Sequence, residues 1–202
     1  AFEAAADKLS AARRKAAKAL DKQVAEELPA LKLEKARFET QVQSDASKPG
    51  SHGVDRVEFV VATNPGTPLS PLMKIASGGE LARFMLALKV VLAAKGSAPV
   101  LIFDEIDTGV GGAVADAIGK RLARLAEGLQ VLAVTHSPQV AARAVQQMLI
   151  SKMEDVASKR MVTRVQPLSA QSRREELARM LSGATVTDAA RAQADQLLAG
   201  QG

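Results

Sequence analysis

The chain has 202 residues, 47% of them hydrophobic, with a formal net charge of +5 and no cysteine. This length predicts one domain, or one domain with an appendage, and the lack of cysteine excludes a disulfide framework or a cysteine-based metal site. Aromatic residues make up only 2% of the chain, which disfavours a base-stacking platform for single strands, so any nucleic acid should be contacted through its backbone phosphates.

Residues 1–31 predict a long helix, because they are rich in Ala, Lys, Arg, Glu and Leu and contain no glycine. Phe2, Leu9 and Ala16 recur every seven residues, and a companion seam of alanines has the same spacing. This pattern is typical of one arm of an antiparallel coiled coil; an amphipathic helix packed on its own domain is the alternative. Basic side chains on this helix indicate a solvated face or, alternatively, a contact with the DNA backbone. They are Lys8, Arg13, Arg14, Lys15, Lys18 and Lys22.

Helices and strands alternate in the rest of the chain. Two segments of alternating polarity predict strands that pair across a polar loop, and two continuous apolar runs predict strands buried on both faces. This order predicts an α/β fold with a largely parallel sheet flanked by helices. The predicted strands are 36–42, 57–61, 100–103, 131–134, 148–150 and 161–165, and the helices are 81–92, 113–127, 172–181 and 187–198.

Two glycines stand where the helix over 81–92 should begin. Ser77 and Glu80 fit a capping box, but that motif does not require Gly78 and Gly79, each of which costs about 1 kcal/mol relative to alanine within a helix. Glycines leave backbone N–H groups bare, so that an anion can approach the N-terminus of the helix. The stretch therefore predicts a phosphate-binding site.

Acidic and polar residues follow both apolar strands, at the edge where ligands bind in open α/β sheets. Asp104 suits a Mg²⁺ ion held against phosphate oxygens, and Glu105 suits the polarising of an attacking water. Asp107 adds a third acid, and His136 follows the second strand. In the alternative interpretation, the acids cap the following turn and the histidine is structural.

No phosphate-binding loop of the form G-x-x-x-x-G-K-[ST] occurs in the sequence. The nearest candidate, Gly119-Lys120, has Val114 in place of the first glycine and Arg121 in place of the hydroxyl residue. The chain thus combines an acid pair and an anion site with no loop for a triphosphate.

The order of these motifs resembles the carboxy-terminal lobe of an ABC ATPase head. Ala-Ser-Gly-Gly-Glu over 76–80 is similar to the ABC signature, the strand ending in Asp104 and Glu105 to Walker B, and Thr-His at 135–136 to the switch histidine. Within that superfamily, residues 74–81, 103–109 and 135–141 resemble the RecN family of bacterial DNA-repair proteins, which is related to the SMC proteins. The similarity covers nearly the whole chain, with one visible departure from many ABC proteins, Ala76 in place of leucine.

This resemblance implies an ATPase head that is split in sequence, with a Walker A lobe first, then a coiled coil, and then the second lobe. Residues 1–31 would be a stub of the coiled-coil arm and residues 32–202 the carboxy-terminal head lobe. That organisation fits the missing phosphate-binding loop. It also fits Ala1, which is not a methionine, as the start of a fragment or a processed product.

The resemblance also implies roles for individual residues and for ATP and Mg²⁺ as cofactors. Asp104 would bind the metal, Glu105 would activate the hydrolytic water, and His136 would contact the γ-phosphate. Asp107 would be the D-loop aspartate at the nucleotide. The signature residues would bind ATP held by the opposite head of a homodimer. These are Ser77, Gly78, Gly79 and Glu80.

The function expected from the resemblance is ATP-driven head dimerisation in DNA double-strand-break repair and recombination. Its partners would be the Walker A lobe, a second head, and DNA through its phosphates. The sequence has no membrane-spanning run and no secretory signal, so we expect a cytoplasmic, nucleoid-associated protein without a membrane partner. Two alternatives are an ATP-independent, Mg²⁺-dependent nuclease or topoisomerase-like site at Asp104, Glu105 and Asp107, and a non-catalytic coiled-coil scaffold.

Overall fold

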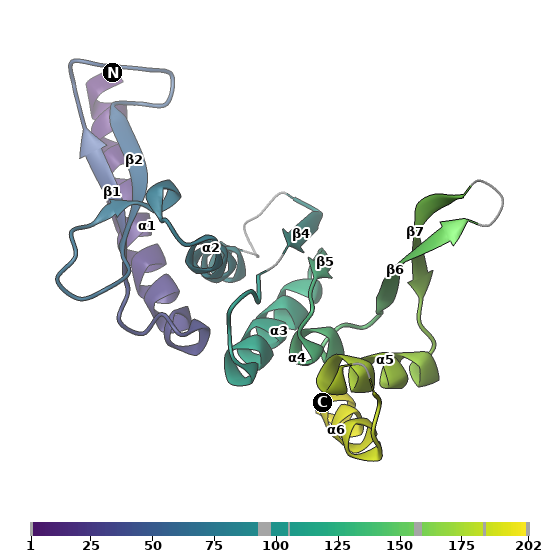
Figure 1. Ribbon diagram of the computed structural model, residues 1–202. Coiled ribbons are helices and arrows are strands. Elements are labelled where there is room, and N and C mark those ends of the chain that lie inside the picture. The colour runs from purple at the N-terminus through teal and green to yellow at the C-terminus, as the bar shows by residue number, and fades with distance from the viewer. Residues whose placement is uncertain (1, 93–97, 105, 156–158, 184, 201–202) are drawn as a thin grey trace. The chain divides into compact units, whose positions relative to one another are not determined.

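The computed structural model describes residues 2–92, 98–104, 106–155, 159–183 and 185–200. The chain divides into two units, residues 1–98 and 99–202, which are described separately (Figure 1). Among the described residues, no helix combines the length and the apolar character needed to cross a bilayer.

The first unit contains a long helix, a small antiparallel sheet and a second helix. The long helix runs along the hairpin of β1 and β2 (Figure 1). The hairpin is in register from Arg37 opposite Ala62 to Ser44 opposite Asp55, which confirms the predicted pairing of these strands. The elements are α1 (Phe2–Glu27), η1 (Pro29–Leu31), β1 (Arg37–Ser44), β2 (Asp55–Ala62), β3 (Ser70–Pro71), η2 (Leu72–Lys74) and α2 (Gly78–Leu92).

A carboxylate on the hairpin ties β2 to α1. Asp55 accepts hydrogen bonds from the hydroxyls of Ser44 at 2.6 Å and Ser10 at 2.7 Å, and it pairs with the guanidinium of Arg13 at 2.9 Å. The bond from Ser44, then those from Arg13 and Ser10, lower the pKa of Asp55 to about 2. The carboxylate therefore stays charged in more acidic solution than an ordinary aspartate and links both strands of the hairpin to α1.

The face of α1 that packs on the hairpin differs from the seven-residue seam in the sequence. The buried residues are Ala6, Ser10, Ala17 and Val24, whereas Phe2 of the seam is 50% exposed. The seam is open within this unit, and the coiled-coil arm and the division at residue 31 stay predictions.

The second unit alternates strands and helices, as the sequence predicts, and ends in two packed helices. Strands β4 and β5 pair in parallel, and β6 and β7 form an antiparallel hairpin (Figure 1). The short helix α4 was not predicted. The elements are β4 (Val100–Asp104), α3 (Gly112–Ala126), β5 (Gln130–Val134), α4 (Pro138–Ala142), β6 (Met148–Asp155), β7 (Arg160–Pro167), α5 (Ala170–Ser182) and α6 (Asp188–Ala199).

Helices α4, α5 and α6 share a small aliphatic core around Leu177 and Ala194. The N-termini of α5 and α6 are capped, because Ser169 accepts a bond from the Ser172 amide and Thr187 accepts one from the Ala190 amide. Five of its six buried residues are alanines, larger aliphatic side chains pack around them, and the cluster contains no aromatic residue.

The predicted burial of β4 and β5 on both faces is wrong. Ile102 is 71% exposed, Val134 48% and Leu132 44%, and these residues lie on one face of the two-stranded sheet. The β6–β7 hairpin also exposes apolar side chains, among them Met161 at 66%. The apolar strands themselves are confirmed, but the described part of this unit does not contain residues that bury both of their faces.

Candidate nucleotide site

The parallel pairing of β4 and β5 brings two predicted site residues to one edge of the sheet. Asp104 lies opposite Val134 in the register, so both strands end at the same level, and His136 follows two residues later. Both Asp104 and His136 are exposed. The predicted convergence of the two strand ends is confirmed, while Glu105 lies outside the described residues.

Asp107 lies at the same edge but is almost fully buried, at 2% exposure. Its Oδ2 accepts hydrogen bonds from the hydroxyl of Thr135 and from the backbone amide of Ser137, the latter at 3.1 Å. Its other oxygen, Oδ1, is buried without a hydrogen-bond partner among the described residues. The carboxylate thus faces the loop after β5.

The start of α2 carries the other predicted site. Helix α2 begins at Gly78, and the hydroxyl of Ser77 accepts a long hydrogen bond of 3.4 Å from the amide of Glu80, which is one half of a capping box. Ser77 and Gly78 are exposed. A Cβ built on Gly78 meets no atom within 4 Å, so packing within the described residues does not require a glycine there.

Arg83 lies on the same helix, one turn beyond Gly79, and was not singled out from the sequence. Burial lowers its pKa, while the negative charge of Glu80 opposes that shift. Its Nε is buried without a hydrogen-bond partner in the described part of the chain. The Glu80–Arg83 spacing of three residues on a helix was the available signal for this interaction.

The sheet edge at Asp104 offers some, but not all, of the ligands that a Mg²⁺ ion needs. Asp104 offers an exposed carboxylate, and Mg²⁺ is usually held by one or two carboxylates together with waters and substrate phosphates. No group of three or more potential metal ligands occurs among the described residues. Asp104 therefore offers one carboxylate ligand that Mg²⁺ could share with waters and substrate phosphates.

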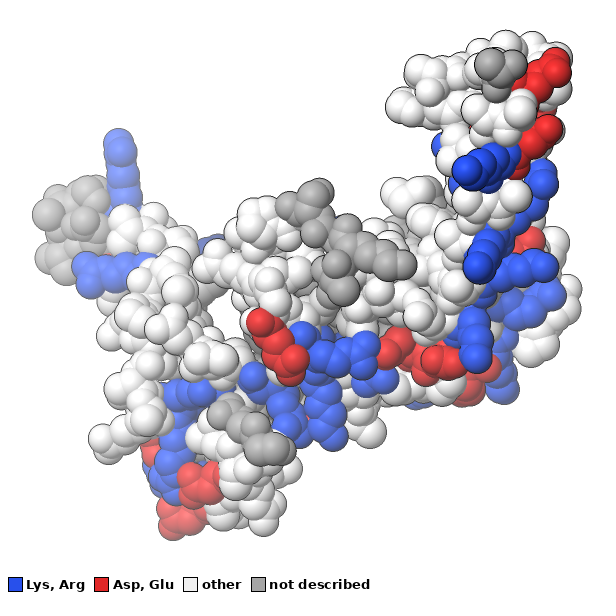
Figure 2. All heavy atoms as spheres, turned by 180° about the vertical axis from the view of Figure 1, so that it is seen from behind, with Lys and Arg blue, Asp and Glu red and all other residues white. Residues whose placement is uncertain are grey.

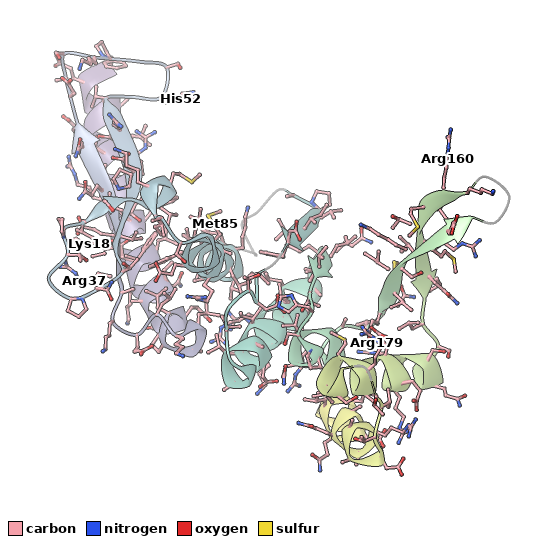
Figure 3. The ribbon with its side chains drawn as sticks, in the orientation of Figure 1. Lys18, Arg37, His52, Met85, Arg160 and Arg179 are labelled. Atoms are coloured by element: carbon pink, nitrogen blue, oxygen red, sulfur yellow. The ribbon has the colours of Figure 1, made fainter. Side chains whose placement is uncertain are left out.

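A shallow groove of about 520 Å³ lies elsewhere in the second unit, between the base of the β6–β7 hairpin and α5. Figure 3 labels Arg179 on α5, whose guanidinium pairs with Glu176 at 2.6 Å. None of the predicted site residues lines this groove, so it does not belong to the edge at Asp104.

Comparison with curated proteins finds close relatives named DNA repair protein RecN. The chain is 44% identical over 197 residues to the protein of Vibrio cholerae and 45% identical over 193 residues to that of Rickettsia prowazekii. These matches cover 98% and 96% of the chain but only 35% and 34% of the relatives. The chain thus spans about a third of their length. A scan against protein-family models finds no match.

Solved structures of SMC proteins share the fold of this chain. The Smc head domain with coiled coil and joint from Pyrococcus yayanosii aligns with a TM-score of 0.59 at 22% identity, covering 79% of this chain and 28% of the other. A structure from work on ATP-driven dimerization and DNA-stimulated activation of SMC ATPases aligns with a TM-score of 0.53 at 19% identity. It covers 87% of this chain and 99% of the other. The predicted α/β class, with the fold of an SMC-type head domain, is confirmed, and among the described strand pairs β4–β5 is parallel while the others are antiparallel.

Proposed function

Since the chain belongs to the RecN family of DNA repair proteins, we propose that it forms the carboxy-terminal lobe of an ATP-hydrolysing head that acts in double-strand-break repair and recombination. The observation that carries this proposal is the shared edge of β4 and β5, where Asp104 and the loop of His136 meet. A carboxylate and an exposed imidazole at one strand edge suit the binding of a nucleotide phosphate with its metal.

In this proposal, each predicted residue acts on the phosphates. Asp104 holds Mg²⁺, which supplies charge neutralisation for the phosphates when it is bound. Glu105 orients the attacking water, and His136 donates a hydrogen bond to the γ-phosphate. Phosphoryl transfer is mainly a matter of positioning and electrostatic stabilisation, so these groups need not form covalent intermediates.

The exposed apolar face of β4 and β5 supports a second lobe that packs on this face of the sheet. Parallel sheets are normally covered on both faces, yet Ile102 and Leu132 are 71% and 44% exposed. Contiguous exposed apolar side chains mark an interaction surface. We assign this face to the Walker A lobe of the same protein, which would also bring the triphosphate loop that the chain lacks.

The exposed start of α2 supports a second head as the other partner. Gly78 presents bare backbone at a helix N-terminus, where N–H groups and the helix dipole favour an anion. One structural neighbour comes from work on ATP-driven dimerization of SMC ATPases. We propose that Ser77, Gly78, Gly79 and Glu80 bind the ATP of the opposite head in a homodimer.

Residues 1–202 alone should bind ATP weakly and hydrolyse it at background rate, because they lack the triphosphate loop. Adding the separately expressed Walker A lobe should raise turnover at least ~10-fold. The measurement is phosphate release at saturating ATP and Mg²⁺. Asp104→Asn in the same mixture is the control that should remove the gain. Robust turnover by residues 1–202 alone would contradict the proposal, and DNA cleavage with Mg²⁺ but without ATP would favour the nuclease alternative.

A stripe of lysines on α1 offers a surface for DNA phosphates. Lys8, Lys15 and Lys22 each come two residues before a buried position of the helix, which places them roughly 200° around the axis, on the opposite face. Lys18 lies on the same side of the helix as these three lysines. All four side chains are exposed, and none has an ion pair among the described residues. Figure 2 shows Lys and Arg side chains following one another along the face of the unit that carries α1.

Replacing these four lysines by alanine should weaken DNA binding and flatten its salt dependence. Each lost phosphate contact reduces the slope of log K against log salt by about 0.9, so the total change should be about 3 to 4. The measurement is a fluorescence-anisotropy titration of duplex DNA at several salt concentrations. A control variant with the same loss of charge replaces Lys35, Lys48, Lys152 and Arg160, which are also exposed. Equal effects of the two variants would argue against a defined stripe.

A protein of this function works on chromosomal DNA, and we therefore propose a cytoplasmic, nucleoid-associated location. The scaffold alternative would require assembly that is indifferent to ATP. It would leave the exposed start of α2 and the shared strand edge without a role.

A further inference from the structure

The loop that carries His136 is held on both sides of the histidine by one buried carboxylate. Thr135 precedes His136 and donates its hydroxyl to Oδ2 of Asp107, and the amide of Ser137, which follows it, donates to the same oxygen at 3.1 Å. The Ser137 amide also lies 3.0 Å from the Thr135 hydroxyl oxygen. The three groups form a closed ring around the backbone of His136.

The imidazole of His136 is free while its backbone is held. Its side chain is exposed, and within the described part of the chain it makes no hydrogen bond or ion pair. A histidine whose backbone is fixed and whose ring points to solvent can reach a ligand from a defined position. Because the loop is already ordered, ligand binding does not have to offset the conformational entropy cost of ordering it.

Further contacts hold the short helix α4 that begins directly after this ring. The hydroxyl of Ser137 donates to the side-chain oxygen of Gln139 at 2.8 Å. The side chain of Gln139 also lies close to Gly112, because a Cβ built there would be 3.3 Å from its Nε2. At the far end of α4, Arg173 donates to three backbone carbonyls. These are the carbonyls of Ala141, Ala142 and Ala144, at 3.2, 2.9 and 2.5 Å.

We propose that Asp107 is a positioning residue, which fixes the loop of His136 to the end of β4 and acts on the phosphates only through that histidine. The inference rests on the proposed function, because the role of His136 belongs to it. Asp107 is 2% exposed, and its Oδ2 is already occupied by two donors. It therefore has almost no surface to offer a nucleotide, in contrast to the direct contact that the resemblance implies.

A double-mutant cycle in the full-length protein separates the two roles. Asp107→Ala should lower kcat about 10- to 100-fold while nucleotide Kd changes less than about 3-fold, because a displaced catalytic group costs rate. Combined with His136→Ala, it should lower kcat no further than His136→Ala does alone, since both act through the same imidazole. A rise in Kd of 10-fold or more, with additive effects on kcat, would establish direct nucleotide contact and overturn the proposal.

Variants of Thr135 keep the test decisive if Asp107→Ala fails to fold. Thr135→Val removes one donor to the carboxylate and should lower kcat in the same direction, whereas Thr135→Ser keeps the hydroxyl and should restore it. Thr163→Val, on the exposed face of β7, is the matched control without effect. A loss of melting temperature with unchanged kcat per folded molecule would show a merely structural role and overturn the proposal.

Hydrogen exchange of the loop gives a readout that does not depend on ATP turnover. In Asp107→Asn, the amide of Ser137 should exchange at least ~10-fold faster than in the wild type, because an amide side chain has one acceptor oxygen and no charge. Unchanged exchange would contradict the inference. Absence of turnover in the wild type would instead refute the proposed function and leave this measurement valid.

Discussion

Gly78→Arg in the full-length protein is expected to lower ATP turnover at least ~100-fold without destabilising the fold. The loss follows because a side chain at the first residue of α2 covers the backbone N–H groups that would bind the phosphate of the opposite head, and removing such donors costs 10²–10³ in rate. The fold should tolerate the change, since a Cβ at this position meets no atom within 4 Å. Phosphate release and thermal melting measure the two effects.

The control for this variant is Gly128→Arg, at another glycine whose Cβ would meet open space. It lies in the turn after α3, outside every predicted motif, and should leave turnover unchanged. Gly78→Ala should give an intermediate loss of turnover and an equal or slightly higher melting temperature, because alanine is the better helix residue by up to about 1 kcal/mol. If Gly78→Arg keeps full turnover, α2 does not bind the nucleotide.

Most elements of the fold followed from periodicity in the sequence. The alternating segment at 57–61 lies within β2, and the predicted helix at 172–181 lies within α5, because each has enough residues to display a period of 2 or 3.6. Helix α4 has five residues, from Pro138 to Ala142. So short a helix shows little more than one turn of any pattern, and its existence depends on contacts such as those from Arg173.

Burial was predicted less well than secondary structure. The apolar runs at β4 and β5 predicted both strands correctly, but an apolar run does not show which surface covers its faces, and the described part of the second unit leaves one face exposed. Ile102 at 71% exposure is the result. On α1, the seven-residue spacing of Phe2 and Leu9 likewise differs from the set of buried residues, and these two side chains are 50% and 39% exposed.

The candidate site shows the same division between local and tertiary information. The sequence places Asp104 and His136 after two strands, and strand topology then brings them to one edge. It could not show that Asp107 turns inward, since Thr135 and Ser137 lie 28 and 30 residues away and meet it only through the β4–β5 pairing. The sequence alone does not distinguish a buried carboxylate from an exposed one among the three acids at 104, 105 and 107.

Two inactive variants should restore activity to each other if the signature residues act on the opposite head. Gly78→Arg removes the contribution of a head to the site on the opposite head. Glu105→Gln removes the residue that orients water in the site on the same head. Each alone should leave turnover near background. In an equimolar mixture of full-length proteins, about half of the dimers are mixed and each has one intact site, so turnover should recover to about a quarter of the wild-type value.

The matched control is a mixture of Glu105→Gln with Asp104→Asn. Both substitutions damage the hydrolytic side, so every site in every dimer carries a defect and no turnover should return. This comparison distinguishes a composite site from a weak general rescue by dimerisation, and the fraction of mixed dimers is measured in both mixtures so that turnover can be compared per mixed dimer. No recovery in the first mixture would mean that Gly78 and Glu105 serve the same head, and the second head would then have no part in hydrolysis. Recovery in the control mixture would show that the rescue is general, and it would contradict a composite site.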